Sequence, residues 1–371
     1  MSSHTRAFVV ITPQSLAGGV INALEPLARA ALYIALMLMV GLPIGLAGVV
    51  LPVFRRHAAD TQPVLAFARR GLVVASLVML TGATVFFVAQ VAPLELEFSS
   101  VEEWIEFVRR SLLGQMWLVR LVLGLIALLA LKLAVSPAAW LAGCALAGLA
   151  AQATITRTSH SAAMGEGWMP VAADFAHLFA GALWGGGLAA LLLAVRCVLR
   201  NQVRGSVELA RALIRRFSPL GIAGVALAAG TGIALSSVHV SDADALRNSD
   251  YGRLILLKIV LAAGAIALAA LHKFVTQRRM RSPGDVRRFS RTLLAEAILV
   301  VGVFAGAALL ASTSPPHHMV THQMPDGSTH MMVMTDPDFQ RALQIAALAI
   351  LAAGAIAFAL EWHERLKSQA R

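Results

Sequence analysis

The stretch 171-VAADFAHLFAGALWGGGLAALLLAV-195 is long and apolar enough to cross a membrane as a single helix. Asp174 and His177 nevertheless fall in its first two turns, and Trp184 lies near its middle. At about 100° per residue, these three side chains share one face of a helix. Polar groups are costly in the hydrocarbon region, so this face is expected to point into a bundle of helices.

The composition of the whole chain is typical of a polytopic membrane protein. Of its 371 residues, 58% are hydrophobic and 14% are charged, whereas a soluble domain averages about 25% charged residues. Cys144 and Cys197 are far apart and form no CxxC motif, so we expect neither a disulfide nor a thiolate metal centre. The sequence has no GxxxxGK[ST] motif and no evident nucleophile arrangement, so we do not expect an enzyme.

Hydropathy predicts an all-α fold with about nine transmembrane helices. The expected spans are residues 30–53, 71–92, 117–134, 138–156, 172–195, 218–238, 254–272, 292–312 and 340–360. Residues 1–29 precede them as an N-terminal segment, of which 7–25 lie on the membrane surface or form a weaker tenth span. The rest divides into N-terminal helices (30–134), a transmembrane core (138–312), a loop (313–338) and a last helix with its tail (340–371).

The basic residues predict how the chain is oriented. Most of the 31 Lys and Arg residues lie in alternate loops and in the C-terminal tail, which marks these segments as cytoplasmic. Nine spans then place the N-terminus outside the cytoplasm and the C-terminus inside. This topology accounts for the net charge of +11, and we expect the bilayer as partner and no nucleic acid.

The predicted outer loop 313–338 is rich in His and Met. It contains His317, His318, Met319, His322, Met324, His330, Met331, Met332 and Met334. Imidazole suits Cu(II) and zinc, and thioether selects Cu(I), so this mixture favours copper in either oxidation state. The alternative is a low-complexity loop that binds nothing, and composition does not show which residues are ligands.

The span that begins near Val171 carries a second candidate site. His177 is a candidate metal ligand, and Asp174 is either a second ligand or the acceptor that fixes the imidazole tautomer. His160 lies in the short loop just before this span, so it is expected at a similar depth. The alternative is a packing role, in which Asp174 forms a hydrogen bond with His177 or with a neighbouring helix.

Further polar residues lie in or at the ends of the later spans. Lys258 is expected about one turn into the seventh span, where it could extend outward to the membrane surface. Glu296 is expected about one turn into the eighth span from the cytoplasmic side. A structural ion pair explains each of them at least as well as a transport role. We expect His272, at the inner end of the seventh span, to be solvated or to lie at the membrane interface.

The residues Ser159, His160, Pro170, Asp174, His177, Trp184, Gly186 and Gly187 form the pattern SH…PxxxDxxH…WxGG. This pattern resembles the copper resistance D (CopD) family of inner-membrane proteins. Three later stretches agree: 216-RFSPLGIAGVALAAGTG-232, 251-YGRLILLK-258 and 295-AEAILVVGVFAGAALLASTSPP-316. The chain departs from the family at His272–Lys273, where an Asn-Arg-like pair is expected, and the family pattern does not require so rich a His/Met loop.

The resemblance implies copper handling at the bacterial inner membrane, usually movement from periplasm to cytoplasm beside a small periplasmic copper carrier, CopC. It also implies His160, Asp174 and His177 as site residues. We therefore expect copper translocation in copper homeostasis or resistance. Two alternatives stay open. One is a haem-binding redox protein that uses His177 with His160 or His239. The other is a copper-binding or docking protein that transports nothing.

Overall fold

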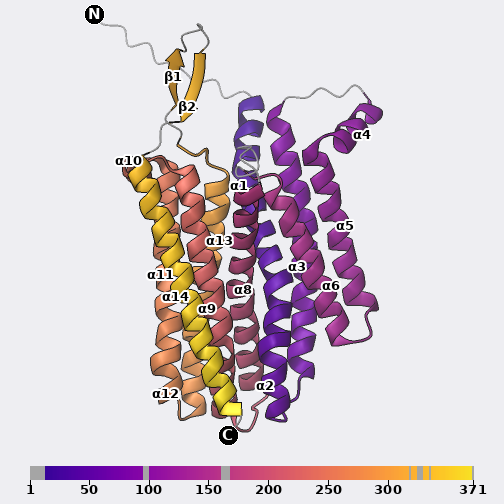
Figure 1. The fold of residues 1–371 in the computed structure, drawn as a ribbon. Helices are drawn as coiled ribbons and strands as arrows, with labels where there is room; N and C mark the ends of the chain where they lie inside the picture. The colour runs from indigo at the N-terminus through magenta and orange to yellow at the C-terminus, as the bar shows by residue number, and fades with distance from the viewer. Residues whose placement is uncertain are drawn as a thin grey trace, which may run out of the picture.

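The computed structural model describes residues 13–94, 100–159, 168–316, 319–323, 329–333 and 336–369, of which 13–23, 319–323, 329–333 and 364–369 are described by their backbone alone. Within these ranges, nine helices are long and apolar enough to cross a membrane. They stand side by side in one bundle (Figure 1). The chain is thus a helical, multi-pass membrane protein, as its hydropathy predicts.

The helices follow the chain in this order. The first span comprises α1 (Pro13–Gly45), the π-helical turn η1 (Leu46–Val50) and α2 (Leu51–Arg56). The next elements are α3 (Gln62–Val91), η2 (Ala92–Leu94), α4 (Val101–Arg110), α5 (Leu112–Leu133), α6 (Pro137–Thr156), α8 (Trp168–Arg200) and α9 (Ser206–His239). The last helices are α10 (Ala243–Asn248), α11 (Asp250–Leu271), the π-helical turn η3 (His272–Thr276), α12 (Gln277–Arg279), α13 (Pro283–Ala311) and α14 (Pro337–Gln369).

Helix α8, which holds the opening stretch, is at the centre of the bundle and packs against α1, α6, α9 and α13. Its glycine run brings its backbone against that of α1. A Cβ atom added to Gly186 would lie 2.5 Å from Cα of Gly41, and one added to Gly41 would lie 1.7 Å from the carbonyl oxygen of Ala182. Only glycine permits this approach, and close contact between small residues is a main source of helix association in lipid.

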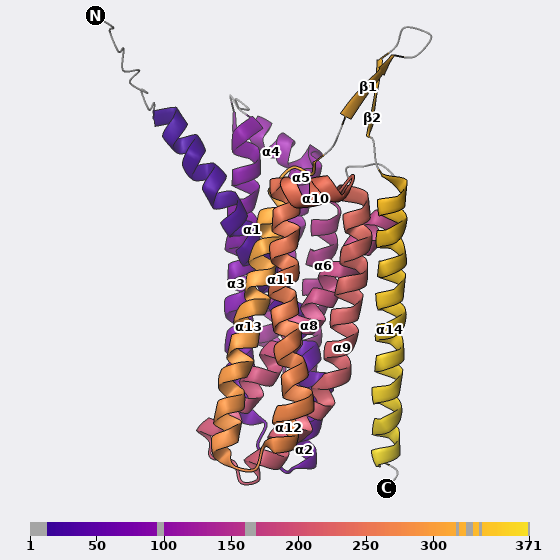
Figure 2. The same ribbon diagram turned by 90° about the vertical axis from the view of Figure 1, so that its left-hand side faces the viewer.

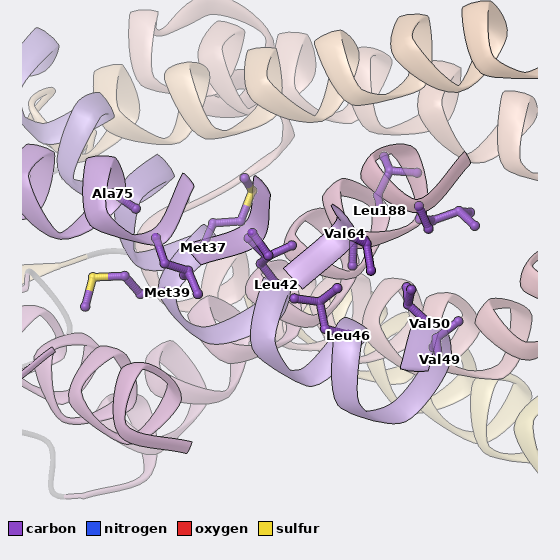
Figure 3. Packing of buried hydrophobic residues seen from close by; sticks show 14 of the residues in the cluster. Met37, Met39, Leu42, Leu46, Val49, Val50, Val64, Ala75 and Leu188 are labelled. Carbon is purple, nitrogen blue, oxygen red and sulfur yellow. The ribbon is translucent and has the colours of Figure 1, made fainter. Parts of the chain in front are cut away.

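Aliphatic side chains and methionines fill the interior around α1. Met37, Leu42 and Leu46 of the first span meet Val64 of α3 and Leu188 of α8 in this core (Figure 3). Trp184 is buried in the same core, one helical turn before Leu188, and its backbone and Cβ face Gly224 of α9. The position of Trp184 on the polar face of α8 therefore serves packing, as its sequence context suggests.

The outward faces of several helices are apolar. Ile259 and Val260 of α11 and Ile345 and Leu348 of α14 are exposed. Large exposed apolar surfaces are rare on soluble monomers but are required where a helix contacts lipid. Helix α14 packs against α9 at one edge of the bundle (Figure 2). The interior polar side chains described below therefore lie behind a lipid-facing shell.

Two segments differ from the sequence-based expectation. The first helix begins at Pro13, so residues 13–29 continue the first span as helix. In the predicted loop 313–338, strands β1 (Met319–Gln323) and β2 (Thr329–Val333) form an antiparallel hairpin with His322 opposite His330. The hairpin lies beyond the bundle end where α8 begins, and α14 ends at the opposite side (Figure 1). Which of these ends faces the cytoplasm stays a prediction.

Candidate metal site

His177 lies in the third turn of α8, and α9 fixes the orientation of its ring. Its Nδ1 is 2.9 Å from the carbonyl oxygen of Ala228 and 3.2 Å from Oγ1 of Thr231. Because a carbonyl oxygen only accepts hydrogen bonds, Nδ1 carries a proton and donates it. The lone pair of a neutral His177 ring is therefore on Nε2, the nitrogen that remains to bind a metal.

Lys258 of α11 occupies the position opposite that lone pair. Its Nζ lies 3.1 Å from Nε2 of His177 and is the donor of this hydrogen bond. The outward-extended position that the sequence suggested for Lys258 is therefore wrong. Three helices, α8, α9 and α11, meet at one imidazole, and each of its nitrogens has a partner.

Asp174 lies one turn before His177 on α8 and is partly buried. Its carboxylate is close enough to interact electrostatically with Lys258 and Tyr251 of α11 and with Tyr33 of α1. The Ala228 carbonyl, and not Asp174, holds the proton on Nδ1 of His177. Asp174 thus supplies negative charge beside a position that already attracts a cation.

Gly232, the residue after Thr231 on α9, provides space for the imidazole. A Cβ atom at this position would lie 2.9 Å from Cε1 of His177. Real side chains essentially never approach so closely, so a substituted residue would displace the ring. The stretch 216–232, noted above for its family resemblance, therefore contains three residues that contact His177 or leave space for it: Ala228, Thr231 and Gly232.

The other predicted site residues lie partly or wholly outside this description. His160, His317, His318, Met324 and Met334 are outside the described residues. The backbones of Met319, His322, His330, Met331 and Met332 form the hairpin, without described side chains. Among the described residues, no group of three or more His, Cys, Asp or Glu side chains could hold a metal. Asp174 and His177 are thus the predicted site residues whose side chains the structure describes.

His239, one of the residues considered for haem, has partners of its own. It lies at the end of α9, and its Nδ1 is 2.7 Å from the carbonyl oxygen of Leu235. Its ring stacks on that of Tyr251. His239 is eight residues beyond Thr231, which is about 12 Å along a helix axis. Two axial ligands must approach one iron from opposite sides, and this separation disfavours His177 and His239 as such a pair.

A second buried polar cluster lies towards the other end of α11. Nδ1 of His272 is 2.9 Å from Oε2 of Glu296, and Nε2 is 2.8 Å from Oγ1 of Thr292. His272 is only 4% exposed and Glu296 only 1%, so the alternative of a solvated His272 is wrong, whereas its position at the membrane interface stays a prediction. His272 opens the π-helical turn η3, and it follows Lys258 by 14 residues, or about 21 Å of helix.

Two family models match the chain. The model described as "Copper resistance protein D-like, N-terminal domain" matches residues 20–171, and "Copper resistance protein D" matches residues 211–310. The chain belongs to the copper resistance protein D family. Asp174 and His177 lie between the two matches, whereas Ala228, Thr231 and Lys258 lie within the second. As a member of this family, the chain is a multi-pass membrane protein with a role related to copper.

A relative and a solved structure extend this result. "Copper transport protein CutJ" of Bacillus subtilis is 32% identical over 160 residues, which are 43% of this chain and 28% of CutJ. The bd oxidase of Geobacillus thermodenitrificans matches with a TM-score of 0.51 at 12% identity, covering 94% of this chain and 98% of the oxidase chain. At this identity the likeness to the oxidase concerns the fold alone.

Proposed function

We propose that this member of the copper resistance D family moves copper across the bacterial inner membrane, from periplasm to cytoplasm, with His177 as a ligand inside the bundle. One observation carries the proposal: Nε2 of His177 presents its lone pair to a positively charged nitrogen 3.1 Å away. The position is thus built to accept a cation. The ring cannot turn away from it without losing the hydrogen bond from Nδ1 to Ala228.

The chemistry of the surroundings fits copper. A neutral imidazole binds both Cu(I) and Cu(II), and the carboxylate of Asp174 offsets part of the positive charge. His160, close to this site in sequence, is proposed to complete the ligand set, and the His/Met segment 317–334 is proposed to take copper from a CopC-like carrier. A few ligands of moderate strength suit transport, because an ion that is bound too tightly is not released.

Copper flux into proteoliposomes, compared between the natural chain and His177→Ala, tests this proposal. We expect flux to fall at least about tenfold in His177→Ala, because loss of a ligand removes the inner site. His57→Ala is the matched control, since His57 is exposed at the end of α2. Normal flux in His177→Ala would overturn the assignment of this residue.

Copper binding is measured separately, because metal on the outer segment would mask the loss of one site. We use a loop-substituted protein, in which the nine His and Met residues of 317–334 are replaced by Ser. In this protein, His177→Ala should abolish the remaining tight Cu(I) site in competition with a coloured chelator. Copper binding without any flux would favour a docking protein, and a Soret band in the purified chain would favour haem.

A further inference from the structure

The contact between Lys258 and His177 occupies the nitrogen that a metal ion would need. The proton on Nδ1 of His177 is committed to Ala228, so Nε2 has one lone pair and can serve only one partner at a time. In this structure that partner is Nζ of Lys258. A metal ion needs the same lone pair, so copper and the ammonium group exclude each other at Nε2.

The ammonium group of Lys258 interacts with two groups of the neighbouring helix α8. Lys258 is partly buried on α11, with exposed apolar residues on either side of it. It donates to the imidazole of α8, and the charge of Asp174, also on α8, acts on it. A lysine that leaves Nε2 can stay near Asp174, so exchange with copper need not leave the ammonium group without a counter-charge. The exchange therefore moves a charge within the site.

We infer that Lys258 is a tethered competitor that copper must displace from His177, and that it sets both the affinity and the selectivity of the site. This inference rests on the proposed function, because it takes His177 as a copper ligand. A cation displaces Lys258 only if it binds imidazole more strongly than the ammonium group does. Copper and similar soft or borderline ions meet this condition, whereas Na⁺, K⁺, Mg²⁺ and Ca²⁺ prefer oxygen ligands and do not.

The competition also explains how the site could release its ion. Each time copper leaves Nε2, Lys258 can return and block rebinding. Competition from Lys258 lowers the copper affinity of the site, and this satisfies the requirement that a transported ion is bound but not trapped. Removal of the competitor should therefore strengthen binding, which is the opposite of the result expected for a lysine with a structural role.

The test measures Cu(I) affinity by chelator competition in the loop-substituted full-length protein. Lys258→Gln and Lys258→Ala should each bind copper at least about tenfold more tightly than the parent. Lys258→Arg keeps the positive charge and should bind no more tightly than the parent. His177→Ala added to Lys258→Gln should abolish the gain. In proteoliposomes made with the natural loop, Lys258→Gln should reach saturation at lower copper but with a lower maximal flux.

The outcomes separate this inference from the proposed function. If His177→Ala lowers copper binding but neither neutral substitution of Lys258 raises it, Lys258 is not a competitor and only this inference fails. If His177→Ala leaves binding and flux unchanged, the proposed function fails, and the inference fails with it. A thermal melt identifies any variant that does not fold, and the second neutral variant then carries the test. Equal copper affinities of Lys258→Arg and Lys258→Gln would also overturn the inference.

Discussion

Gly232 shows how a single missing side chain can determine the geometry of the candidate site. The imidazole of His177 lies directly against the backbone of α9 at this residue. The same turn of α9 supplies the Ala228 carbonyl and the Thr231 hydroxyl that contact Nδ1. The space at Gly232 and the two oxygen atoms act together, so the ring has both a fixed orientation and room to occupy it.

Gly232→Ala should therefore weaken copper binding without removing a ligand. The added Cβ would lie 2.9 Å from Cε1 of His177, so the ring must shift away from its hydrogen-bond partners. We expect about a tenfold loss of Cu(I) affinity, comparable with the loss of an outer-shell contact at a metal site. Gly306→Ala on α13 is the control, because a Cβ there meets no atom within 4 Å. Equal affinities in the two variants would contradict the role assigned to Gly232.

At the scale of elements, the π-helical turn η3 is joined to α13 by buried polar contacts. His272 at its start bonds to Glu296 and Thr292, and its ring meets that of Phe289 edge-on at 5.0 Å. A π-helical turn has a wider backbone than an α-helix and often marks a functional or strained position. Here its first side chain connects two neighbouring helices, and we interpret the cluster as a structural link between α11 and α13.

Glu296 offers a test of that interpretation. Glu296→Leu leaves the ring nitrogen of His272 buried without an acceptor, so it should lower the free energy of unfolding by about 1–3 kcal/mol. Glu296→Gln keeps a carbonyl oxygen for Nδ1 and should unfold close to the natural chain. Both effects are measured by thermal or denaturant unfolding in detergent. If Glu296→Gln is stable but abolishes copper flux, the carboxylate has a transport role and a purely structural link is wrong.

For the molecule as a whole, the sequence predicts the number and place of the spans well. Lipid requires runs of roughly 20 apolar residues in helical form, and such runs are visible without any tertiary information. The polar face of α8 is predictable for the same reason, since Asp174 and His177 are conspicuous in an apolar stretch. Helix ends are less predictable, because α1 continues to Pro13 through a mixed segment.

The partners of these residues could not be predicted from the sequence. His177 and Lys258 are 81 residues apart, and His272 and Glu296 are 24 apart. Helical periodicity gives the face of one helix but not the neighbour that this face meets. Arg120 was missed entirely: it is 1% exposed on α5 and donates hydrogen bonds to the hydroxyl and carbonyl oxygens of Thr154 in α6 and to the hydroxyl of Thr158 just after α6. Its buried acceptors are a backbone carbonyl and hydroxyl groups, which no motif marks.

The orientation of the bundle decides what its two ends can do. The start of helix α8 and the β1–β2 hairpin lie at one end of the bundle (Figure 1). The loops and the C-terminal segment that contain most of the 31 Lys and Arg residues lie at the other end. Basic loops remain on the cytoplasmic side during insertion. In the predicted orientation, His177, in the third turn of α8, would lie towards the periplasm, and the His272–Glu296 cluster would lie towards the cytoplasm.

Reporter insertions at the two ends test this orientation. Alkaline phosphatase, which is active only in the periplasm, should be active when inserted at residues 313–316 and inactive at residues 57–61, between α2 and α3. Green fluorescent protein should fluoresce when fused after the C-terminal residue, since it folds in the cytoplasm. The two phosphatase insertions serve as controls for each other, because both follow the end of a helix and are expected at opposite ends of the bundle. If both signals are reversed, His177 faces the cytoplasm, and the direction of transport proposed here must be inverted.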